Sequence, residues 1–451
     1  MIGPVSRPWL VAAALLGGLA SGRTISDPPA PANLLIVTLD TTRADRLSAY
    51  GFQSASMSAI DRLAREGTVF LRATTVAPLT LPAHCSLLTG LYPPHHGVRD
   101  NADSPLDPAH LTLAELLHRR GFRTAAFVAS SVLAANRGLA RGFDVYRDTT
   151  ASSAAPPPSV RRPGNEVVDD ALNWLGGRYN LPFFLWVHLY DAHAPYRPPE
   201  PYRTQYAFDP YEGSLAFLDS QVGRLIQALE AHHQLNRTLI VVTSDHGESL
   251  GDHGELEHGI FLYESVLHVP LIMRVPGVAP RPFVSVTSLV DVLPTVLGFL
   301  RLPAAPVDGV DLSPAIRGIA PLADRVVYAE SRYPERFGWS ALRALRDERS
   351  KFIDAPRSEL YDLESDPFEE RNLYAPGSAA VIALTARSGA LGDIWQISLE
   401  SAVGPVPPDV KARLAALGYV TVETSHPGAS GLDPKDFIQT YNAIRQAGRL
   451  R

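Results

Sequence analysis

The chain has 451 residues, of which 45% are hydrophobic and 20% charged, a composition typical of a folded globular protein and not of a disordered or fibrous one. Its 41 basic and 47 acidic residues give a net charge of −6, and no dense run of Lys or Arg offers the basic surface of a nucleic-acid-binding protein. Cys85 is the only cysteine in the sequence, which excludes an internal disulfide and a thiolate metal cluster.

The N-terminal segment has the order of a signal peptide. Arg7 precedes an apolar stretch, Trp9–Ala20, which is followed by the small residues Ser21 and Gly22. The stretch is shorter than the roughly 20 residues that a membrane-spanning helix needs. We therefore predict a signal peptide over residues 1–24 and export to the periplasm or the extracellular space, without a stable membrane span after cleavage. A buried N-terminal helix or an uncleaved membrane anchor is the alternative interpretation.

Short apolar runs along the chain predict buried strands, and helical segments lie between them. Helices are predicted at Ser58–Glu66, which Gly67 ends, and at Ser214–Ala231. The alternation of strands and helices predicts a mostly parallel sheet with helices on both faces, and ligands bind such sheets at the carboxyl ends of the strands. The predicted strands are Leu34–Leu39, Thr124–Val128, Phe183–Val187 and Thr238–Thr243.

The pattern changes in the last third of the chain. From about Ser340 the periodic segments become shorter, with a strand expected at Glu359–Leu363, and this indicates a small antiparallel subdomain. An amphipathic helix is predicted from Pro434 to about Ala447. Ala151–Pro163, rich in Ala, Ser and Pro, is expected to be a surface loop. The predicted domains are a catalytic α/β domain at residues 30–340, the subdomain at 341–425, and a linker with a terminal helix at 426–451.

The segment Pro78–Gly90 reads PLTLPAHCSLLTG and combines helix signals with a hydroxyl group. Pro82 suits the first turn of a helix and Gly90 its end, so Thr80 is expected at the helix N-terminus. Unpaired backbone N–H groups and the helix dipole favour an anion there, next to the Thr80 hydroxyl. Taken by itself, Thr80 is more simply interpreted as a helix cap.

The LLTG ending of this segment resembles the signature of sulfatases, which belong to the alkaline phosphatase superfamily. In that signature a Cys or Ser is followed by Pro and then Arg, at fixed positions ahead of LLTG. Counting back from LLTG aligns Thr80 with the Cys or Ser, Pro82 with the proline and His84 with the arginine, so the resemblance implies that His84 contacts the substrate.

Cys85 does not fit the signature, because Leu87 and Thr89 stand where Pro and Arg would follow it. The resemblance therefore implies that the formylglycine of sulfatases is absent and that Thr80 is the nucleophile. A threonine nucleophile is similar to that of the nucleotide phosphodiesterases, phosphoethanolamine transferases and lipoteichoic acid synthases of the same superfamily.

Two motifs at predicted strand ends resemble the metal-binding motifs of the family. Asp40 follows the first apolar run, and Asp245-His246 follows the last. The resemblance implies one divalent metal ion, Zn²⁺, Mn²⁺ or Ca²⁺, held by Asp40, Asp245, His246 and Thr80. Such an ion makes the alkoxide of a hydroxyl accessible and screens an incoming anion. Thr41 stands where many sulfatases carry a second Asp, so one family ligand is absent.

Three further segments resemble those that contact the substrate in the family. Val98–Asn101 corresponds to a segment whose Asn contacts a non-bridging ester oxygen, which makes Asn101 the first candidate and Arg99 the second. His193 corresponds to a histidine that faces the leaving group. His258 stands where sulfatases carry a lysine; a histidine there can act as a general acid or bind a second metal.

The resemblance covers residues 32–375, including Leu360–Pro367, which is similar to a motif of the sulfatase C-terminal subdomain. It implies an α/β fold, namely an alkaline-phosphatase-like three-layer α/β/α sandwich with a mostly parallel central sheet and a small C-terminal antiparallel subdomain. It also implies a hydrolase or transferase that acts through Thr80 on a small-molecule, glycan or lipid-headgroup ester.

Phospho-esters are favoured over sulfate esters, because formylglycine hydrate can expel sulfate, whereas a sulfated threonine must be hydrolysed by water. Two alternatives stay open. One is a true sulfatase that works without formylglycine, and the other is a catalytically inactive binding module. The sequence does not determine the oligomeric state.

Overall fold

The computed structural model describes residues 29–53, 57–148, 161–176, 181–397, 406–419 and 431–449. The predicted signal peptide and most of the predicted loop at Ala151–Pro163 lie outside the described residues.

Eight strands form the central sheet, in the order β5-β4-β6-β1-β7-β8-β2-β9. The five strands from β5 to β7 run parallel, whereas β8 is antiparallel to both of its neighbours. Every residue of β1, β6 and β7 is buried, as expected for strands covered on both faces. All four predicted strands are confirmed. The bounds are β1 Asn33–Leu39, β2 Thr68–Phe70, β4 Arg123–Val128, β5 Val145–Arg147, β6 Phe183–Leu189, β7 Thr238–Thr243, β8 Leu271–Arg274 and β9 Arg281–Phe283.

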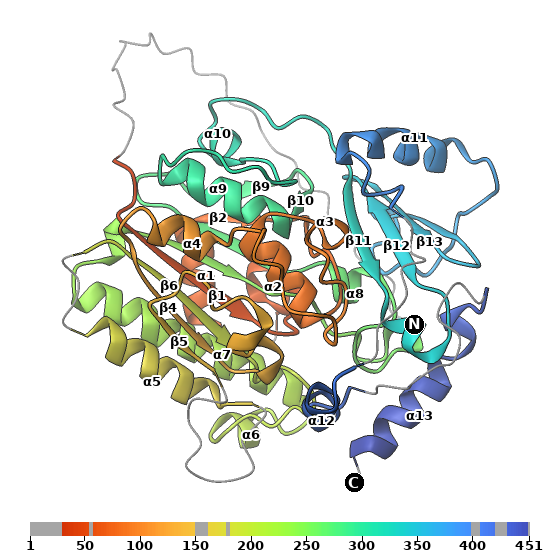
Figure 1. Ribbon diagram of the computed structural model, residues 1–451, viewed down its shortest axis with the longest axis horizontal. Coiled ribbons are helices and arrows are strands. Elements are labelled where there is room, and N and C mark those ends of the chain that lie inside the picture. The colour runs from red at the N-terminus through yellow and green to blue at the C-terminus, as the bar shows by residue number, and fades with distance from the viewer. Residues whose placement is uncertain are drawn as a thin grey trace, which may run out of the picture.

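Helices cover both faces of this sheet (Figure 1), which confirms the predicted three-layer sandwich. Helices α1 (Ser58–Glu66), α5 (Gly164–Leu175) and α7 (Pro210–Ala231) pack together on one face. On the other face lie α2 (Thr80–Thr89), α4 (Leu113–His118) and α9 (Val292–Phe299). The shorter helices are α3 Pro93–His96, α6 Tyr202–Gln205, α8 Glu264–Leu267 and α10 Ser313–Ile316.

Helix α7 begins one turn before the predicted start. Asp209 accepts a hydrogen bond from the backbone N–H of Glu212, and Pro210 occupies the first helical position. Both are helix-start signals, so the sequence supports the longer helix.

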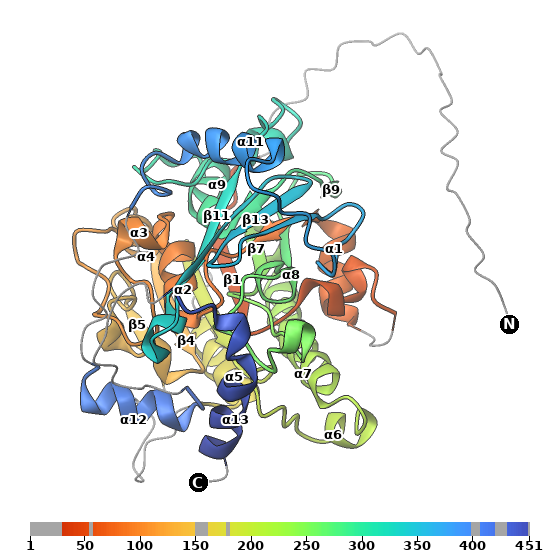
Figure 2. The ribbon, with the colours of Figure 1, turned by 90° about the vertical axis from the view of Figure 1, so that its right-hand side faces the viewer.

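A second, four-stranded antiparallel sheet follows, in the order β11-β12-β13-β14 (Figure 2). Its first strand precedes position 341, where the sequence analysis places the start of the subdomain. Helix α11, Ala379–Arg387, packs beside it. The strands are β11 Val327–Ser331, β12 Leu342–Arg346, β13 Ser350–Asp354 and β14 Glu359–Asp362; a separate two-stranded sheet pairs β3 Ala73–Thr74 with β10 Thr287–Ser288.

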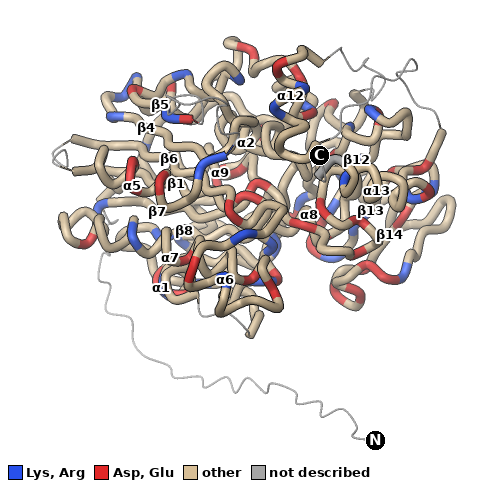
Figure 3. The backbone as a smooth tube through the Cα atoms, turned by 90° about the horizontal axis from the view of Figure 1, so that it is seen from below, with Lys and Arg blue, Asp and Glu red and all other residues tan. Residues whose placement is uncertain are grey.

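The described C-terminal part contributes α12, Pro408–Ala416, and α13, Ile438–Arg449. The predicted terminal helix is therefore present, although it opens with a 3₁₀ turn at Pro434–Asp436. Figure 3 looks onto the face of the molecule that carries α12 and α13, where acidic and basic segments are interspersed. None of the described helices combines the length and the apolar character that a bilayer crossing requires.

Candidate active site

The candidate residues meet at the carboxyl edge of the central sheet. Asp40 follows β1 directly, Asp245 follows β7 after one residue, and His193 follows β6. Because β6, β1 and β7 are neighbours in the sheet, their ends bring these side chains together. One ligand atom from each of Asp40, Asp245 and His246 lies within 4.8 Å of the others, and all three residues are buried.

The backbone turns sharply after both strands. Thr41 has a φ of 56°, in the left-handed region, and its N–H donates to Asp245 Oδ1 over 3.3 Å. Gly247 lies so close to the next loop that a Cβ there would be 2.1 Å from the carbonyl oxygen of Ser265. The local sequence thus permits two tight turns that present Asp40 and His246 to the same point.

Thr80 is the first residue of α2, and its hydroxyl faces the carboxylates. The N-cap residue is Leu79, which makes no side-chain cap, so the helix-capping interpretation of Thr80 does not hold. Thr80 Oγ1 lies 3.4 Å from Asp40 Oδ2 and 3.4 Å from His246 Nε2. The hydroxyl therefore stands at the N-terminus of a ten-residue helix, beside two candidate metal ligands.

The donor set of this cluster fits a divalent cation. Within the described part of the chain, Asp40 Oδ1 and Asp245 Oδ2 are buried without a hydrogen-bond partner. Burial, and then the neighbouring Asp245, raise the pKa of Asp40 well above its ordinary value. His246 Nδ1–H donates to the Gly247 carbonyl over 2.9 Å, which leaves the lone pair of Nε2 on the side of Thr80. Two carboxylate oxygens and one imidazole nitrogen are therefore available as ligands. Zn²⁺, Mn²⁺ or Ca²⁺ could bind to such a set.

Two further histidines contact the cluster: His188 on β6 and His84 on α2. His188 Nδ1 accepts from the Ala129 N–H over 3.2 Å, so its Nε2–H donates to Asp40 Oδ2 over 3.1 Å. His84 Nδ1–H donates to the Thr80 carbonyl over 2.7 Å, and its Nε2 accepts from Thr38 Oγ1 over 3.1 Å. Both ring nitrogens of His84 are thus engaged by the protein, which supports a positioning role in place of the substrate contact expected from the sequence.

Asn101 and Arg99 have different environments. The Leu81 N–H, in the first turn of α2, donates to Asn101 Oδ1 over 2.9 Å, and Asn101 Nδ2 is a buried donor without a partner among the described residues. Arg99 instead makes a two-pronged ion pair with buried Glu330, with Nε 2.7 Å from Oε1. Asn101 therefore keeps a free donor beside α2, whereas the charge of Arg99 is already paired inside the protein.

His193 has one free ring nitrogen. Its Nδ1–H donates to the Ala194 carbonyl over 2.8 Å, and Nε2 is buried without a hydrogen-bond partner in the described structure. The ring stacks on Tyr190 with centroids 4.4 Å apart and meets His258 edge-on at 5.0 Å. This position agrees with a histidine that faces the reacting ester.

His258 is oriented by a carboxylate. Its Nδ1–H donates to Glu248 Oε1 over 2.8 Å, and Nε2 lies 3.0 Å from the hydroxyl of Tyr419. The His258 ring packs against His246 with centroids 4.4 Å apart. A buried carboxylate on Nδ1 stabilises the imidazolium form, as a proton donor requires.

Three residues of this site carry no role in the sequence analysis: His188, Glu248 and Tyr419. His188 ends the apolar run of β6, and Glu248 lies three residues after Asp245, so position relative to a strand end is a usable signal for both. Tyr419 comes from the far C-terminal part, and nothing in its local sequence indicates the contact.

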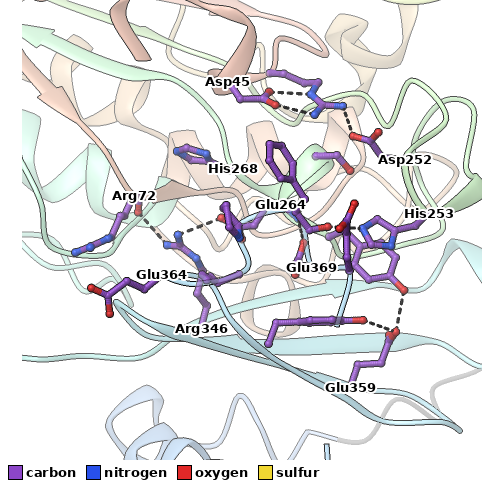
Figure 4. Close-up of a pocket in the computed structure, with 18 of the residues that line it drawn as sticks. Asp45, Arg72, Asp252, His253, Glu264, His268, Arg346, Glu359, Glu364 and Glu369 are labelled. Atoms are coloured by element: carbon purple, nitrogen blue, oxygen red, sulfur yellow. Dashed lines mark hydrogen bonds and ion pairs between the residues drawn. The ribbon is translucent and has the colours of Figure 1, made fainter. Parts of the chain in front are cut away.

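A cavity of about 740 Å³ lies away from this cluster, between the central domain and the second sheet (Figure 4). It is lined largely by polar and charged residues, among them Glu264, His268 and Arg346. Many of these charges are paired within the protein: Arg346 Nη2 lies 3.1 Å from Glu264 Oε2, and Arg43 binds both Asp45 and Asp252. The cavity therefore does not share the unpaired acceptors of the strand-end cluster.

The fold and the strand-end cluster are those of an ester hydrolase of the alkaline phosphatase type, and comparison with known proteins agrees. Residues 32–302 match the family model described as Sulfatase. The chain belongs to the sulfatase family and is a hydrolase of sulfuric or phosphoric esters.

Its relatives include sulfatases and a phosphonate monoester hydrolase. The ulvan-active sulfatase of Formosa agariphila is 26% identical over 402 residues, covering 77% of this chain and 78% of the relative. Human arylsulfatase A is 25% identical over 438 residues, covering 80% and 86%. The crystal structure of the phosphonate monoester hydrolase of Agrobacterium radiobacter superposes with a TM-score of 0.67 at 25% identity, covering 84% of this chain and 100% of that one.

Proposed function

We propose that this protein cleaves a phosphate- or sulfate-type ester through Thr80, releasing the group to water or to an acceptor alcohol, with phospho-esters favoured. The observation that carries the proposal is the Thr80 hydroxyl at the start of α2, 3.4 Å from both Asp40 and His246. Asp40, Asp245, His246 and Thr80 would hold one divalent cation. That ion supplies a Lewis acid that favours the alkoxide of the hydroxyl and screens the charge of the ester.

The residues around Thr80 have complementary tasks. Thr80 reacts as the alkoxide, its hydroxyl proton having passed to solvent, and its Oγ1 forms a bond to the phosphorus or sulfur atom while the bond to the leaving oxygen breaks. Asn101 Nδ2 and the N-terminus of α2 donate to the non-bridging oxygens, where negative charge accumulates. His258, held as an imidazolium by Glu248, gives its proton to the leaving oxygen.

The second half of the cycle regenerates Thr80. The neutral His258 takes a proton from water or from an acceptor alcohol, whose oxygen attacks the ester formed on Thr80 and releases the Thr80 alkoxide. His193, with its free Nε2, lies on the same side of the site and assists the leaving group or the attacking oxygen. Glu248 stabilises the charge of His258 each time the proton returns.

A true sulfatase that works without formylglycine is the second candidate function. The match to the sulfatase family model and the curated sulfatase relatives favour it. The sequence at the nucleophile position favours the phospho-ester, since threonine lacks the second hydroxyl through which a formylglycine hydrate expels sulfate.

One assay separates the two candidates. The purified protein would be tested with an aryl phosphate monoester, an aryl phosphodiester and an aryl sulfate that share one leaving group, each with the Thr80→Ala variant as control. We expect the highest kcat/KM on a phospho-ester and no turnover by the variant. A preference for the aryl sulfate would select the second candidate, and turnover by Thr80→Ala would exclude Thr80 as nucleophile.

We also propose that the protein is exported through the signal peptide at residues 1–24 and acts on a small-molecule, glycan or lipid-headgroup ester. The apolar segment Trp9–Ala20 supports the first statement. The ulvan-active and choline-sulfatase relatives, whose names refer to a glycan and to a small molecule, support the second.

A further inference from the structure

The reacting groups are closed off from solvent. Thr80, Asp40, Asp245, His246 and His258 each have a relative exposure of 0%. An ester cannot reach the Thr80 hydroxyl in this conformation, so a covering segment has to move before turnover.

The side chain of Tyr419 covers the nucleophile. Because Glu248 binds Nδ1–H and holds His258 as an imidazolium, His258 Nε2–H donates to the Tyr419 hydroxyl oxygen over 3.0 Å. Thr80 also interacts with this hydroxyl. Tyr419 itself is only 2% exposed. Its phenolic oxygen thus lies between the nucleophile and the proton donor, which is the place that the leaving oxygen of an ester has to take.

The surroundings of the Tyr419 ring suit an aryl group. His258, His193 and Tyr333 meet the ring edge-on, with centroids 5.9, 6.1 and 6.1 Å away. The guanidinium carbon of Arg445, on α13, lies 5.1 Å from the ring centroid. Aromatic edges and a cation over a ring face are favourable contacts for any electron-rich ring.

Helix α12, which precedes Tyr419, is itself lightly attached, although Leu417 and Tyr419 beyond its end are buried. Leu414 is the only buried residue of α12, and with Val410 it lies beside Asn101 and Val132. By contrast, most residues of α7 are buried. A helix held by so little apolar contact belongs to the least stable parts of a protein and can open without global unfolding.

We propose that Tyr419 occupies the leaving-group subsite, that this subsite accepts an aryl group, and that the segment Val406–Tyr419 is a tethered competitor of aryl ester substrates. The inference rests on the proposed function, since Thr80 and His258 define the leaving-group side. When α12 withdraws, the aryl group of a phosphate or sulfate ester takes the place of the tyrosyl ring, with its bridging oxygen where the Tyr419 hydroxyl lies.

The test uses the full chain and p-cresol, which is the tyrosine side chain as a free molecule. We expect the Tyr419→Ala variant to bind p-cresol at least about tenfold more tightly than the wild type in calorimetry, because the competing tethered ring is gone. The KM for p-cresyl phosphate, or for the sulfate if that ester is the substrate, should fall in the same direction. Tyr419→Phe keeps the ring and should bind p-cresol as weakly as the wild type.

Two further variants make the experiment decisive. Tyr374→Ala removes a ring that packs on Phe352 away from the site, and it should leave p-cresol binding unchanged. Leu414→Asp keeps Tyr419 but undocks α12, so it should tighten p-cresol binding even if Tyr419→Ala fails to fold. If neither Tyr419→Ala nor Leu414→Asp binds p-cresol more tightly than the wild type, the proposal is overturned.

The two proposals fail in different ways. A loss of kcat in both Tyr419→Ala and Tyr419→Phe, with unchanged p-cresol binding, would make Tyr419 a catalytic residue and not a competitor. Binding of p-cresol needs no turnover, so it reports on the aryl subsite even if Thr80→Ala shows that the nucleophile assignment is wrong.

Discussion

Two buried acidic clusters in this molecule differ in how their charge is balanced. Glu264 and Glu369, near the cavity of Figure 4, flank the ammonium group of buried Lys351 at 3.1 and 2.6 Å. Asp40 and Asp245 have 0% exposure, against 13% for the Glu264 side chain, yet among the described residues no Lys or Arg pairs with either aspartate.

The difference indicates which cluster is structural and which is a site. Buried charges are stable only when they are paired or when they coordinate a metal. The glutamates have their cation within the chain, and Arg346 and Lys351 help to hold the pKa of Glu264 at about 2 although burial acts to raise it. The aspartates have no such partner among the described residues, which supports the proposed cation site, so we expect removal of charge to affect activity at one cluster and stability at the other.

Metal removal should have the largest effect. Chelation is expected to lower turnover on the order of 10³-fold or more, because the cation both activates the hydroxyl and screens the ester. Elemental analysis before and after chelation, followed by return of Zn²⁺, Mn²⁺ or Ca²⁺ one at a time, measures the dependence and identifies the ion. Full activity in protein shown to be free of metal would mean that the Asp40 and Asp245 cluster is not a metal site.

Thr80→Ala should reduce turnover by a similar factor, on the order of 10³-fold or more, since in the described part of the chain no other hydroxyl lies between Asp40 and His246 at the start of α2. Cys85→Ala, five residues further along α2, should keep its activity. Cys85 is fully buried in the core, and burial raises the pKa of its thiol. Mass spectrometry of trapped protein should find the adduct on Thr80. Formylglycine at position 85, or an inactive Cys85→Ala with an active Thr80→Ala, would show that the register from LLTG is wrong.

Lys351→Met should act on stability and leave kcat nearly unchanged. Removing one partner of a buried ion pair typically costs about 3–5 kcal/mol, because the remaining charges are left uncompensated. Denaturant unfolding of the variant and the wild type measures the loss. Arg349→Met, in the turn between β12 and β13 at an exposed ion pair with Asp362, is the matched control and should change stability little. A large fall in kcat with unchanged stability would assign Lys351 to the active site.

Asp40→Asn should have the smallest effect, and unlike Lys351→Met it should stabilise the protein. At pH 7 the metal-free variant should be more stable than the metal-free wild type. Burial raises the folded-state pKa of Asp40 above its ordinary value of 3.8. Ionised Asp40 therefore destabilises the metal-free folded state, and this cost is largest at a pH above the folded-state pKa. The advantage of the variant should therefore vanish at low pH and grow as the pH rises through the folded-state pKa of Asp40. Thermal unfolding of both proteins across this range measures it, and a variant that is less stable at every pH refutes the assignment of Asp40 to an unbalanced cluster.

Much of the fold follows from local patterns. The middle residues of β1 and β7 are consecutive apolar side chains, as expected for strands that are buried on both faces. Helix α1 ends at Glu66, directly before Gly67, as predicted. By contrast, the start of the second sheet at β11 could not be placed, because Val327–Ser331 carries no turn or composition signal that separates it from the preceding domain.

The candidate site was predictable where residues follow strand ends, and less so where contacts come from tertiary structure. Asp40, Asp245 and His246 needed only the rule that parallel strands present their carboxyl ends together. Glu330, which pairs with the charge of Arg99, and Thr38, which binds His84 Nε2, lie far from them along the chain. Tyr419 reaches Thr80 from outside the family motif altogether.

The boundary between the two sheets carries buried charge. Arg99, from the central domain, pairs with Glu330 on β11, and Arg336 Nη2 lies 2.9 Å from Asp100 Oδ1 across the same boundary. Separating the sheets would leave these charges unpaired in a medium of low dielectric constant, at a cost of several kcal/mol for each pair. The two sheets therefore belong to one cooperative folding unit. The smaller sheet has its own topology, but we do not expect it to fold independently. It could therefore not be excised, or exchanged between proteins, without its charge partners.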